Sequence, residues 1–229
     1  MSDSIGCTVR PVIFFFIREE PYGFLSNFER TGFHARPSGL YSQDDPGAKQ
    51  YWYPTNEHFY QSQKALTQEI HDDIVSLSKA TLAMELGRAL ERSKHLQKYC
   101  KPHWRRVMLM VMLTGIRHKF KTEPLSGFGM KDRRKIIQLK LINTGDAILH
   151  ENNPDDPFWG LGDGTGDSWL GKLLMIVREE CKGWSCPVDG VGYMLCHTDG
   201  GGRDPPEDCP VKDICYEMAE YHRMAERNE

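Results

Sequence analysis

The chain has 229 residues, 39% of them hydrophobic, and a formal net charge of −3, so it can bury a sizeable core in one domain with extensions. A pI near 6.3 argues against binding nucleic acid through overall charge, although it is compatible with a local basic groove. No apolar run approaches the roughly 20 residues that span a bilayer, and the N-terminus lacks the pattern of a secretory signal. We therefore expect a cytoplasmic or nuclear protein without membrane contact.

The first 50 residues predict little regular structure. Residues 1–11 have the composition of a flexible N-terminus, and the apolar run Val12 to Ile17 predicts a buried strand. A turn follows, and then the aromatic-flanked segment Phe24 to Phe28. Residues 35–50 are rich in Pro, Gly, Asp and Ser, which is typical of a loop insertion.

Helical periodicity begins near Thr55 and dominates the middle of the chain. Gly145 is a stop signal, and Ala147 to Glu151 is expected to form a short strand that pairs with the N-terminal one. The expected helices cover about 56–67, 69–78, 80–91, 102–120, 131–142 and 168–181.

The composition changes after Glu180. Residues 182–210 contain mostly Gly, Pro, Asp and Cys, and Lys212 to Arg227 predicts a final charged helix. The odd number of cysteines, seven, favours reduced thiols. We expect residues 182–229 to be a Cys-rich extension that lies outside the core and is dispensable for catalysis.

Zinc binding is the alternative for this extension. No Cys-x-x-Cys pair occurs in it, and the irregular gaps are unlike those of a zinc module. We therefore expect neither a metal site nor a cofactor. The side chains that would otherwise supply ligands are Cys186, Cys196, His197, Cys209 and Cys215.

Residues 53–65, YPTNEHFYQSQKA, contain a polar stripe on a predicted helix. Glu57, Gln61 and Lys64 are spaced i, i+4, i+7 and share one face, with His58 beside it. An exposed Glu–Gln–Lys ladder would have the same spacing. The density of aromatic residues around the stripe favours a pocket wall, because a solvated face does not need them. These residues are Tyr51, Trp52, Tyr53, Phe59 and Tyr60.

A second informative segment, residues 155–178, combines glycines with a helix start. Gly160, Gly162, Gly164 and Gly166 precede an apolar helical run for which Ser168 is a good N-cap. Glycine-rich backbone before a helix N-terminus supplies N–H groups and a positive dipole end, and phosphate is its usual ligand. The alternative is a tight loop that only needs positive φ at its glycines.

Acidic side chains near predicted turns offer acid–base groups. Cleavage of a glycosidic C–N bond needs protonation of the leaving base, and a carboxylate or an amine at the oxocarbenium-like carbon. Trp104, at the start of a predicted helix, is either a hydrophobic staple or a stacking platform. The acidic candidates are Glu20, Glu57, Asp155, Asp156, Asp163 and Asp167.

Four motifs occur in order along the chain. They are Phe24 to Phe28 (FLSNF), Tyr53 to Lys64, Leu86-Gly87-Arg88, and the block Trp159 to Arg178. Together they resemble the NADAR family, also called YbiA-like. Ser168 stands where the family often has Asn, so a ligand contact through that amide is in doubt.

The resemblance implies a mainly α fold, a YbiA-like multihelical domain with a small β-sheet over residues 12–181. It also implies an N-glycosidase that acts on ribosyl or ADP-ribosyl compounds, with phosphate held by the glycine block. The reacting groups implied are Glu57, Lys64, Glu20 and Asp156. The substrate-binding residues expected with them are Arg18, Asn27, His58, Gln61, Trp104, Phe158, Trp159, Gly160, Gly164, Gly166, Asp167 and Ser168.

Three functions remain open. The leading one is a hydrolase that removes ADP-ribose from guanine in DNA or RNA, and the loop insertion and the many aromatic residues favour the roomier site it needs. The second is the same chemistry on small phosphoribosyl precursors of riboflavin. A non-catalytic ADP-ribose or NAD-binding module would be favoured if Glu57 or Lys64 pointed into the core. We expect a monomer.

Overall fold

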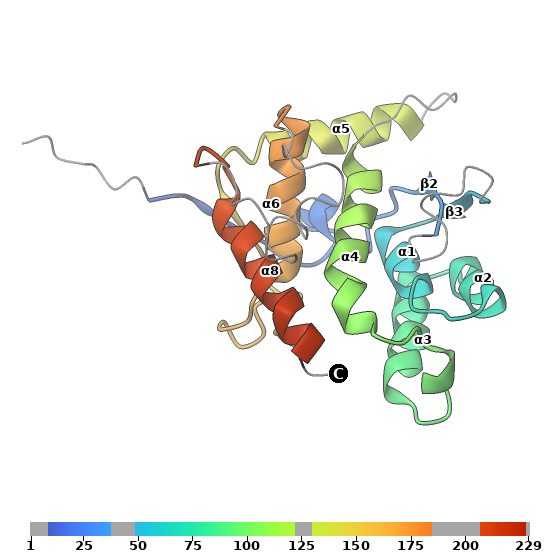
Figure 1. The fold of residues 1–229 in the computed structure, drawn as a ribbon. Helices are drawn as coiled ribbons and strands as arrows, with labels where there is room; N and C mark the ends of the chain where they lie inside the picture. The colour runs from blue at the N-terminus through green and yellow to red at the C-terminus, as the bar shows by residue number, and fades with distance from the viewer. Residues whose placement is uncertain (1–8, 38–48, 122–129, 185–206, 228–229) are drawn as a thin grey trace, which may run out of the picture.

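The computed structural model describes residues 9–37, 49–121, 130–184 and 207–227, and it shows a mainly α protein (Figure 1). The helices lie close to the positions that the periodicity predicts. They are α1 (Asn56–Ser62), α2 (Gln68–Ser76), α3 (Ala80–Arg92), α4 (Trp104–Phe120), α5 (Met130–Ile142), α6 (Trp169–Cys181) and α8 (Lys212–Arg227), with 3-10 turns at Gly23–Leu25 and Gln97–Tyr99.

The expected pairing of the N-terminal strand is confirmed. Strand β1 (Val12–Phe15) runs parallel to β4 (Ile148–Glu151), with Val12 opposite Ile148 and Phe15 opposite Glu151. A second two-stranded sheet was not expected. Its strands β2 (Phe33–Ala35) and β3 (Tyr51–Tyr53) are antiparallel. Three residues are too few to show strand alternation in the sequence, and the two strands flank the predicted loop, of which residues 38–48 lie outside the described chain.

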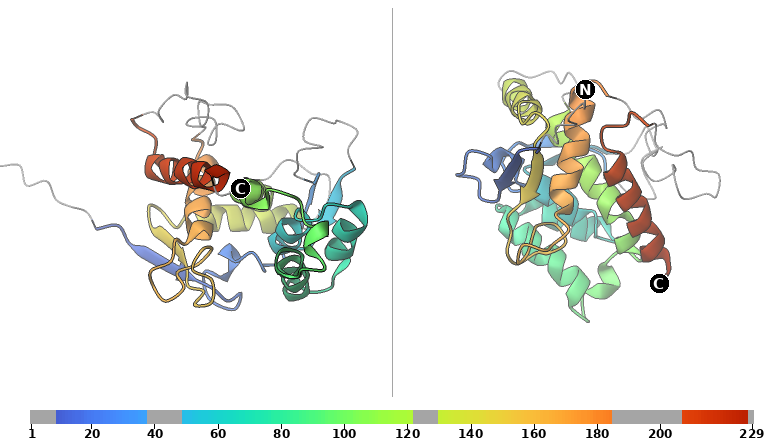
Figure 2. Two further views of the ribbon diagram at one scale, coloured as in Figure 1. Left: turned by 60° about the horizontal axis from the view of Figure 1, so that its bottom comes forward. Right: turned by 90° about the vertical axis from the view of Figure 1, so that its left-hand side faces the viewer.

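The core is built around α4 and α6, which lie side by side in both Figure 1 and Figure 2. Helix α6 also packs against β4, so the parallel strand pair covers one side of this helix. Leu113, Leu170 and Leu174 are completely buried between these elements. The apolar run after Ser168 thus forms the central helix of the domain.

Helix α1 ends at Ser62, five residues before the predicted end. The backbone after it pairs with a distant segment: the Leu66 amide donates to the Tyr99 carbonyl at 2.8 Å, and the Lys101 amide donates to the Lys64 carbonyl at 2.7 Å. These bonds replace the helical ones that local periodicity favours. The helix begins as expected for its sequence, because the Thr55 hydroxyl accepts a hydrogen bond from the His58 amide.

The C-terminal helix α8 is part of the core, which corrects the expectation that the extension lies outside it. Cys215, Met218 and Ala219 are buried, and the helix packs beside α4 (Figure 2). An amphipathic helix buries its apolar stripe against a complementary apolar surface. The sequence of the helix does not show which part of the protein supplies that surface.

Three of the five side chains that could bind zinc in the C-terminal extension, Cys186, Cys196 and His197, are not among the described residues. No group of three or more potential metal ligands occurs among those that are. Nor does any helix in the described ranges combine the length and apolar character that crossing a membrane requires.

Candidate active site

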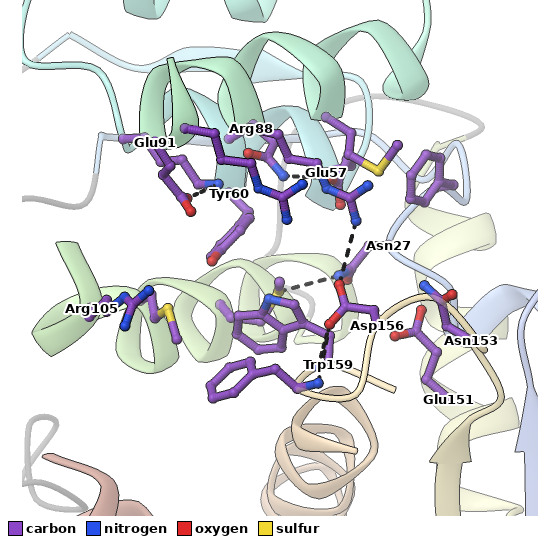
Figure 3. Close-up of a pocket in the computed structure, with 18 of the residues that line it drawn as sticks. Asn27, Glu57, Tyr60, Arg88, Glu91, Arg105, Glu151, Asn153, Asp156 and Trp159 are labelled. Carbon is purple, nitrogen blue, oxygen red and sulfur yellow. Dashed lines mark hydrogen bonds and ion pairs between the residues drawn. The ribbon is translucent and has the colours of Figure 1, made fainter. Parts of the chain in front are cut away.

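A cavity of about 390 Å³ opens between α1, α3, α4, α8 and the segment 151–159 (Figure 3). This volume falls within the range of about 300–1,000 Å³ typical of small-molecule sites. Its walls combine acidic, basic and aromatic side chains. The acidic ones are Glu57, Glu91, Glu151 and Asp156, the basic ones are Lys64, Arg88, Arg92 and Arg105, and the aromatic ones include Tyr60, Phe158, Trp159 and Tyr221.

The polar stripe of α1 faces this cavity. Glu57, Gln61 and Lys64 all line it, and each is at most 5% exposed. The Gln61 amide donates to the Glu57 carboxylate at 2.7 Å. Burial nevertheless raises the pKa of Glu57, because the bond from Gln61 and the charge of Lys64 offset only part of the desolvation. The exposed-ladder interpretation is therefore wrong.

Gly87 of α3 lets the polar stripe of α1 approach α3 closely. A Cβ on Gly87 would lie 2.0 Å from the Gln61 Oε1 atom, so a larger residue there would force the Gln61 side chain to move. The close contact places Arg88 and Glu91 on the cavity wall, where Glu91 forms an ion pair with Lys64. The Lys64 ammonium also lies 5.1 Å from the centre of the Tyr60 ring. The sequence pointed to the Leu-Gly-Arg motif but assigned Arg88 no role.

Asp156 organises the opposite wall. One of its carboxylate oxygens accepts from the amides of Phe158 and Trp159 at 3.2 and 3.0 Å, and the other lies 3.5 Å from the Arg88 guanidinium. The two aromatic rings meet edge to face with centroids 5.0 Å apart. Both rings line the cavity, so the predicted aromatic contact surface is present.

Glu151 is a cavity residue that sequence reasoning missed. It ends strand β4, is 8% exposed, and has its pKa raised to about 8, chiefly by burial and further by the nearby charges of Glu57 and Asp156. At neutral pH this carboxyl group therefore holds a proton that it can donate. Its place at the end of a predicted strand was the one available signal.

The glycine block does not present free amides, which corrects the expected phosphate site. The N–H groups of Gly160, Gly164 and Gly166 donate to the carbonyls of Asp156 and, for the latter two, Leu161, at 2.8–2.9 Å. The first two amides of α6 are also occupied, because they donate to the carbonyls of Phe158 and Trp159. Residues 160–168 all belong to the described chain, and none of them lines the cavity. The tight-loop interpretation therefore describes this segment.

Ser168 differs from its predicted role as an N-cap. Its backbone has φ of 51°, and its hydroxyl makes no capping bond to α6. The hydroxyl instead accepts a hydrogen bond from the Glu151 amide at 3.1 Å. Ser168 thus joins the start of α6 to the end of β4, the position from which Glu151 enters the cavity.

Several predicted site residues lie away from the cavity. Glu20 and Arg18 are exposed; Glu20 accepts from the Phe16 amide, and Arg18 lies 3.5 Å from Glu29. His58 is buried, with its ring nitrogens bonded to the Thr55 hydroxyl and the Leu77 carbonyl. Trp104 packs behind Tyr60, with ring centroids 5.3 Å apart, and Asp167 is exposed. Asn27, in contrast, lines the cavity, where the Asn56 amide holds it at 2.8 Å.

The model of the NADAR domain family matches residues 14–182. The chain belongs to the NADAR family. It is 35% identical over 171 residues to an N-glycosidase of Nostoc punctiforme, covering 74% of this chain and 92% of that protein. It is also 31% identical over 170 residues to the N-glycosidase YbiA of Shigella flexneri, covering 74% of this chain and 88% of that one.

Two further matches show the fold and the range of the family. The NMR structure of Escherichia coli YbiA has 29% sequence identity and a TM-score of 0.55, and the match covers 76% of this chain and 86% of that one. A riboflavin biosynthesis protein of Vibrio vulnificus is 32% identical over 172 residues, which are 74% of this chain but 38% of that longer protein. The expected YbiA-like, mainly α fold is confirmed, and the relatives support an N-glycosidase at the level of the family.

Proposed function

We propose that this protein is an N-glycosidase that cleaves the bond between ADP-ribose and a guanine base of nucleic acid. The observation that carries this proposal is the composition of the cavity. Glu57, Glu151 and Asp156 lie close enough to influence one another's charge, and an amine, Lys64, lies on the same wall as Glu57. These groups can supply what cleavage of a C–N glycosidic bond needs, which is a proton for the leaving base and a carboxylate or an amine at the oxocarbenium-like carbon.

The protonation states suggest distinct roles. Glu151, which is protonated at neutral pH, donates a proton to the leaving base. Asp156, fixed by two backbone amides and facing Arg88, stabilises the oxocarbenium-like carbon, to which water then adds. In this assignment Glu151 takes the place that the sequence gave to Glu20.

A covalent route through Lys64 is the alternative chemistry. The amine would attack the anomeric carbon and displace the protonated base. The ribose ring would then open by breaking the bond between the anomeric carbon and the ring oxygen, which takes up a proton, to give an imine that water hydrolyses. Lys64 must first lose a proton, and its ion pair with Glu91 supplies an acceptor in contact with it. Borohydride reduction during turnover would trap this imine on Lys64.

The rim of the cavity favours a polyanionic substrate. Residues 92–106 contain six Lys and Arg and no Asp or Glu, in a chain whose net charge is −3. This segment joins the end of α3 to the start of α4, and its Arg92 and Arg105 line the cavity. Such a local cationic strip attracts a phosphate backbone without a basic overall pI.

A phosphoribosyl precursor of riboflavin is the second candidate. A volume of about 390 Å³ lies near the lower end of the range for ligand sites and suits a single nucleotide-sized compound. A relative named for riboflavin biosynthesis is consistent with this candidate. The basic rim, which a free small substrate does not need, favours the first candidate.

One experiment separates these functions. The full-length protein is incubated with an oligonucleotide that carries ADP-ribosyl guanine and, separately, with the riboflavin precursor. Release of free ADP-ribose supports the proposal, whereas release of ribose phosphate alone supports the second candidate. Binding of ADP-ribose without either release would indicate a non-catalytic module. Glu57→Gln is the control for contaminating activity.

A further inference from the structure

One residue that lines the cavity lies outside the part of the chain that matches the NADAR family. The NADAR match ends at residue 182, but Tyr221 of α8 lines the cavity beside residues of α3, α4 and the 151–159 segment. Helix α8 therefore adds a side chain to the site that the matched domain does not supply.

Helix α8 is held firmly enough to position that side chain. The Tyr221 ring packs against Phe158 and Trp169, with centroids 5.4 and 6.0 Å away. Glu217, one turn earlier, forms an ion pair with Lys172 of α6. Buried Cys215 and Met218 anchor the same face of the helix in the core.

The Tyr221 hydroxyl is a neutral donor. Burial raises the pKa of this group to about 12, so it keeps its proton at physiological pH. This hydroxyl makes no hydrogen bond with any of the described residues, and the residue is only half-buried. The hydroxyl can therefore donate to a ligand.

Arg105 supplies a second donor at the same edge of the cavity. It lies at the start of the 17-residue helix α4, where the helix dipole is positive. Its positive charge partly offsets the rise that burial causes in the pKa of Tyr221. Arg105 forms no ion pair with any carboxylate in the described ranges, and it lines the cavity (Figure 3). Glu91, an acidic residue that lines the same cavity, is paired with Lys64.

We propose that Arg105 and Tyr221 form an anion subsite at the α4–α8 edge, where both donate hydrogen bonds to a phosphate group of the bound ligand. Both side chains line the same cavity, and a cationic guanidinium together with a neutral hydroxyl donor is suited to a phosphate. Arg105 lies on the far side of the cavity from Glu151 and Asn153 in Figure 3, which separates the phosphate from Glu151. It takes over the role that the sequence assigned to the glycine block. The inference deepens the proposed function and depends on it only in the choice of ligand.

The test is ligand binding to the full chain, measured by calorimetry. We expect Arg105→Gln and Tyr221→Phe each to weaken ADP-ribose binding about tenfold, because a hydrogen bond to a charged group is lost. Tyr221→Phe keeps the ring that packs on Phe158, so its melting temperature should match the wild type. The matched control is Arg223→Gln, an exposed arginine on α8 that pairs with Glu220 and does not line the cavity.

Adenosine, which has no phosphate, distinguishes an anion subsite from a general packing role. Its binding should be the same in the wild type and both variants. The double variant should lose less ADP-ribose affinity than the product of the two single losses, because both groups contact one phosphate. Wild-type affinity for ADP-ribose in the variants, equal loss for adenosine, or a wild type that binds no phosphate-bearing probe would each overturn the inference. If the binding pattern holds but no substrate is cleaved, the proposed function fails and the subsite stands.

Discussion

The polar stripe of α1 and the glycine block 160–168 both belong to motifs of the NADAR family, yet only the first lines the cavity. The stripe places Glu57, Gln61 and Lys64 on the cavity wall. The amides of the three glycines 160, 164 and 166 donate to backbone carbonyls of the block itself and of the preceding segment 151–159, and no residue of the block lines the cavity. The period of a helix fixes the directions of its side chains. In a loop, by contrast, each backbone N–H group has its own direction and its own hydrogen-bond acceptor.

The comparison also explains what the glycine block does for the site. The block joins the segment 151–159 to α6, whose first two amides, of Trp169 and Leu170, donate to the carbonyls of Phe158 and Trp159, and both of these rings line the cavity. Ser168 holds the backbone of Glu151 from the same side. The block therefore supports the backbone of residues that line the cavity, while the stripe of α1 supplies side chains to the cavity wall directly.

The largest expected effect tests the stripe. Lys64→Ala should reduce turnover at least 100-fold, because the amine or its charge is lost from the cavity, while the melting temperature changes little. Turnover of a guanine-ADP-ribosylated oligonucleotide and thermal unfolding measure the two quantities. Lys121→Ala, an exposed lysine that pairs with Glu180, is the control and should leave turnover unchanged. Normal turnover by Lys64→Ala would remove the amine from the mechanism.

The next effect tests the glycine block. A Cβ on Gly166 would lie 2.5 Å from the Pro157 carbonyl oxygen, so Gly166→Ala should lower the free energy of unfolding by about 2–3 kcal/mol. The folded protein should still bind ADP-ribose with wild-type affinity, as calorimetry below the melting transition would show. Weaker binding of ADP-ribose at unchanged stability would instead indicate that this loop binds phosphate.

A third effect concerns the pH dependence of Glu151. Its folded-state pKa of about 8 exceeds the usual carboxyl value near 4.5, so between these two pH values the folded protein binds the extra proton. This contribution to stability is full below about pH 4.5 and is lost as pH rises towards 8. Relative to the wild type, Glu151→Gln should therefore gain stability by about 4 kcal/mol between pH 5 and 8.5.

Denaturant unfolding at a series of pH values measures that difference. Turnover provides a second readout, since wild-type activity should fall above pH 8 as Glu151 loses its proton. A constant stability difference between wild type and Glu151→Gln would show that the carboxyl group is not perturbed by burial.

The smallest effect refines the view of the glycine block. Gly164 has φ of +103°, and no atom lies within 4 Å of the position that a Cβ would take there. Gly164→Ala should therefore cost about 1 kcal/mol of stability through backbone strain alone. Comparison with Gly166→Ala separates strain from collision within one loop. Thermal unfolding of both variants in parallel gives the two values, and a larger loss for Gly164→Ala would contradict the loop geometry.

Much of the fold was predictable because its signals are local. Periodicity placed α3 and α4 within two residues of their observed ends, and the apolar run at Val12 identified the strand that pairs with β4. The short strands β2 and β3 and the end of α1 were missed, because each depends on partners distant in the chain. The site was predictable in part for the same reason: Glu57 and Gln61 share a face of α1, and Lys64, two residues after the end of this helix, lines the same cavity.

By itself, the sequence of this protein determined which segments become helices and which side chains share a face, since 3.6-residue periodicity and capping are properties of neighbouring residues. Only the tertiary structure decided that the amides of the glycine block are occupied, that Glu151 holds a proton, and that Tyr221 reaches the cavity from α8. Hydrogen-bond partners and burial come from residues far apart in the chain. The availability of a donor and the charge of a carboxyl group are therefore set when the elements pack together.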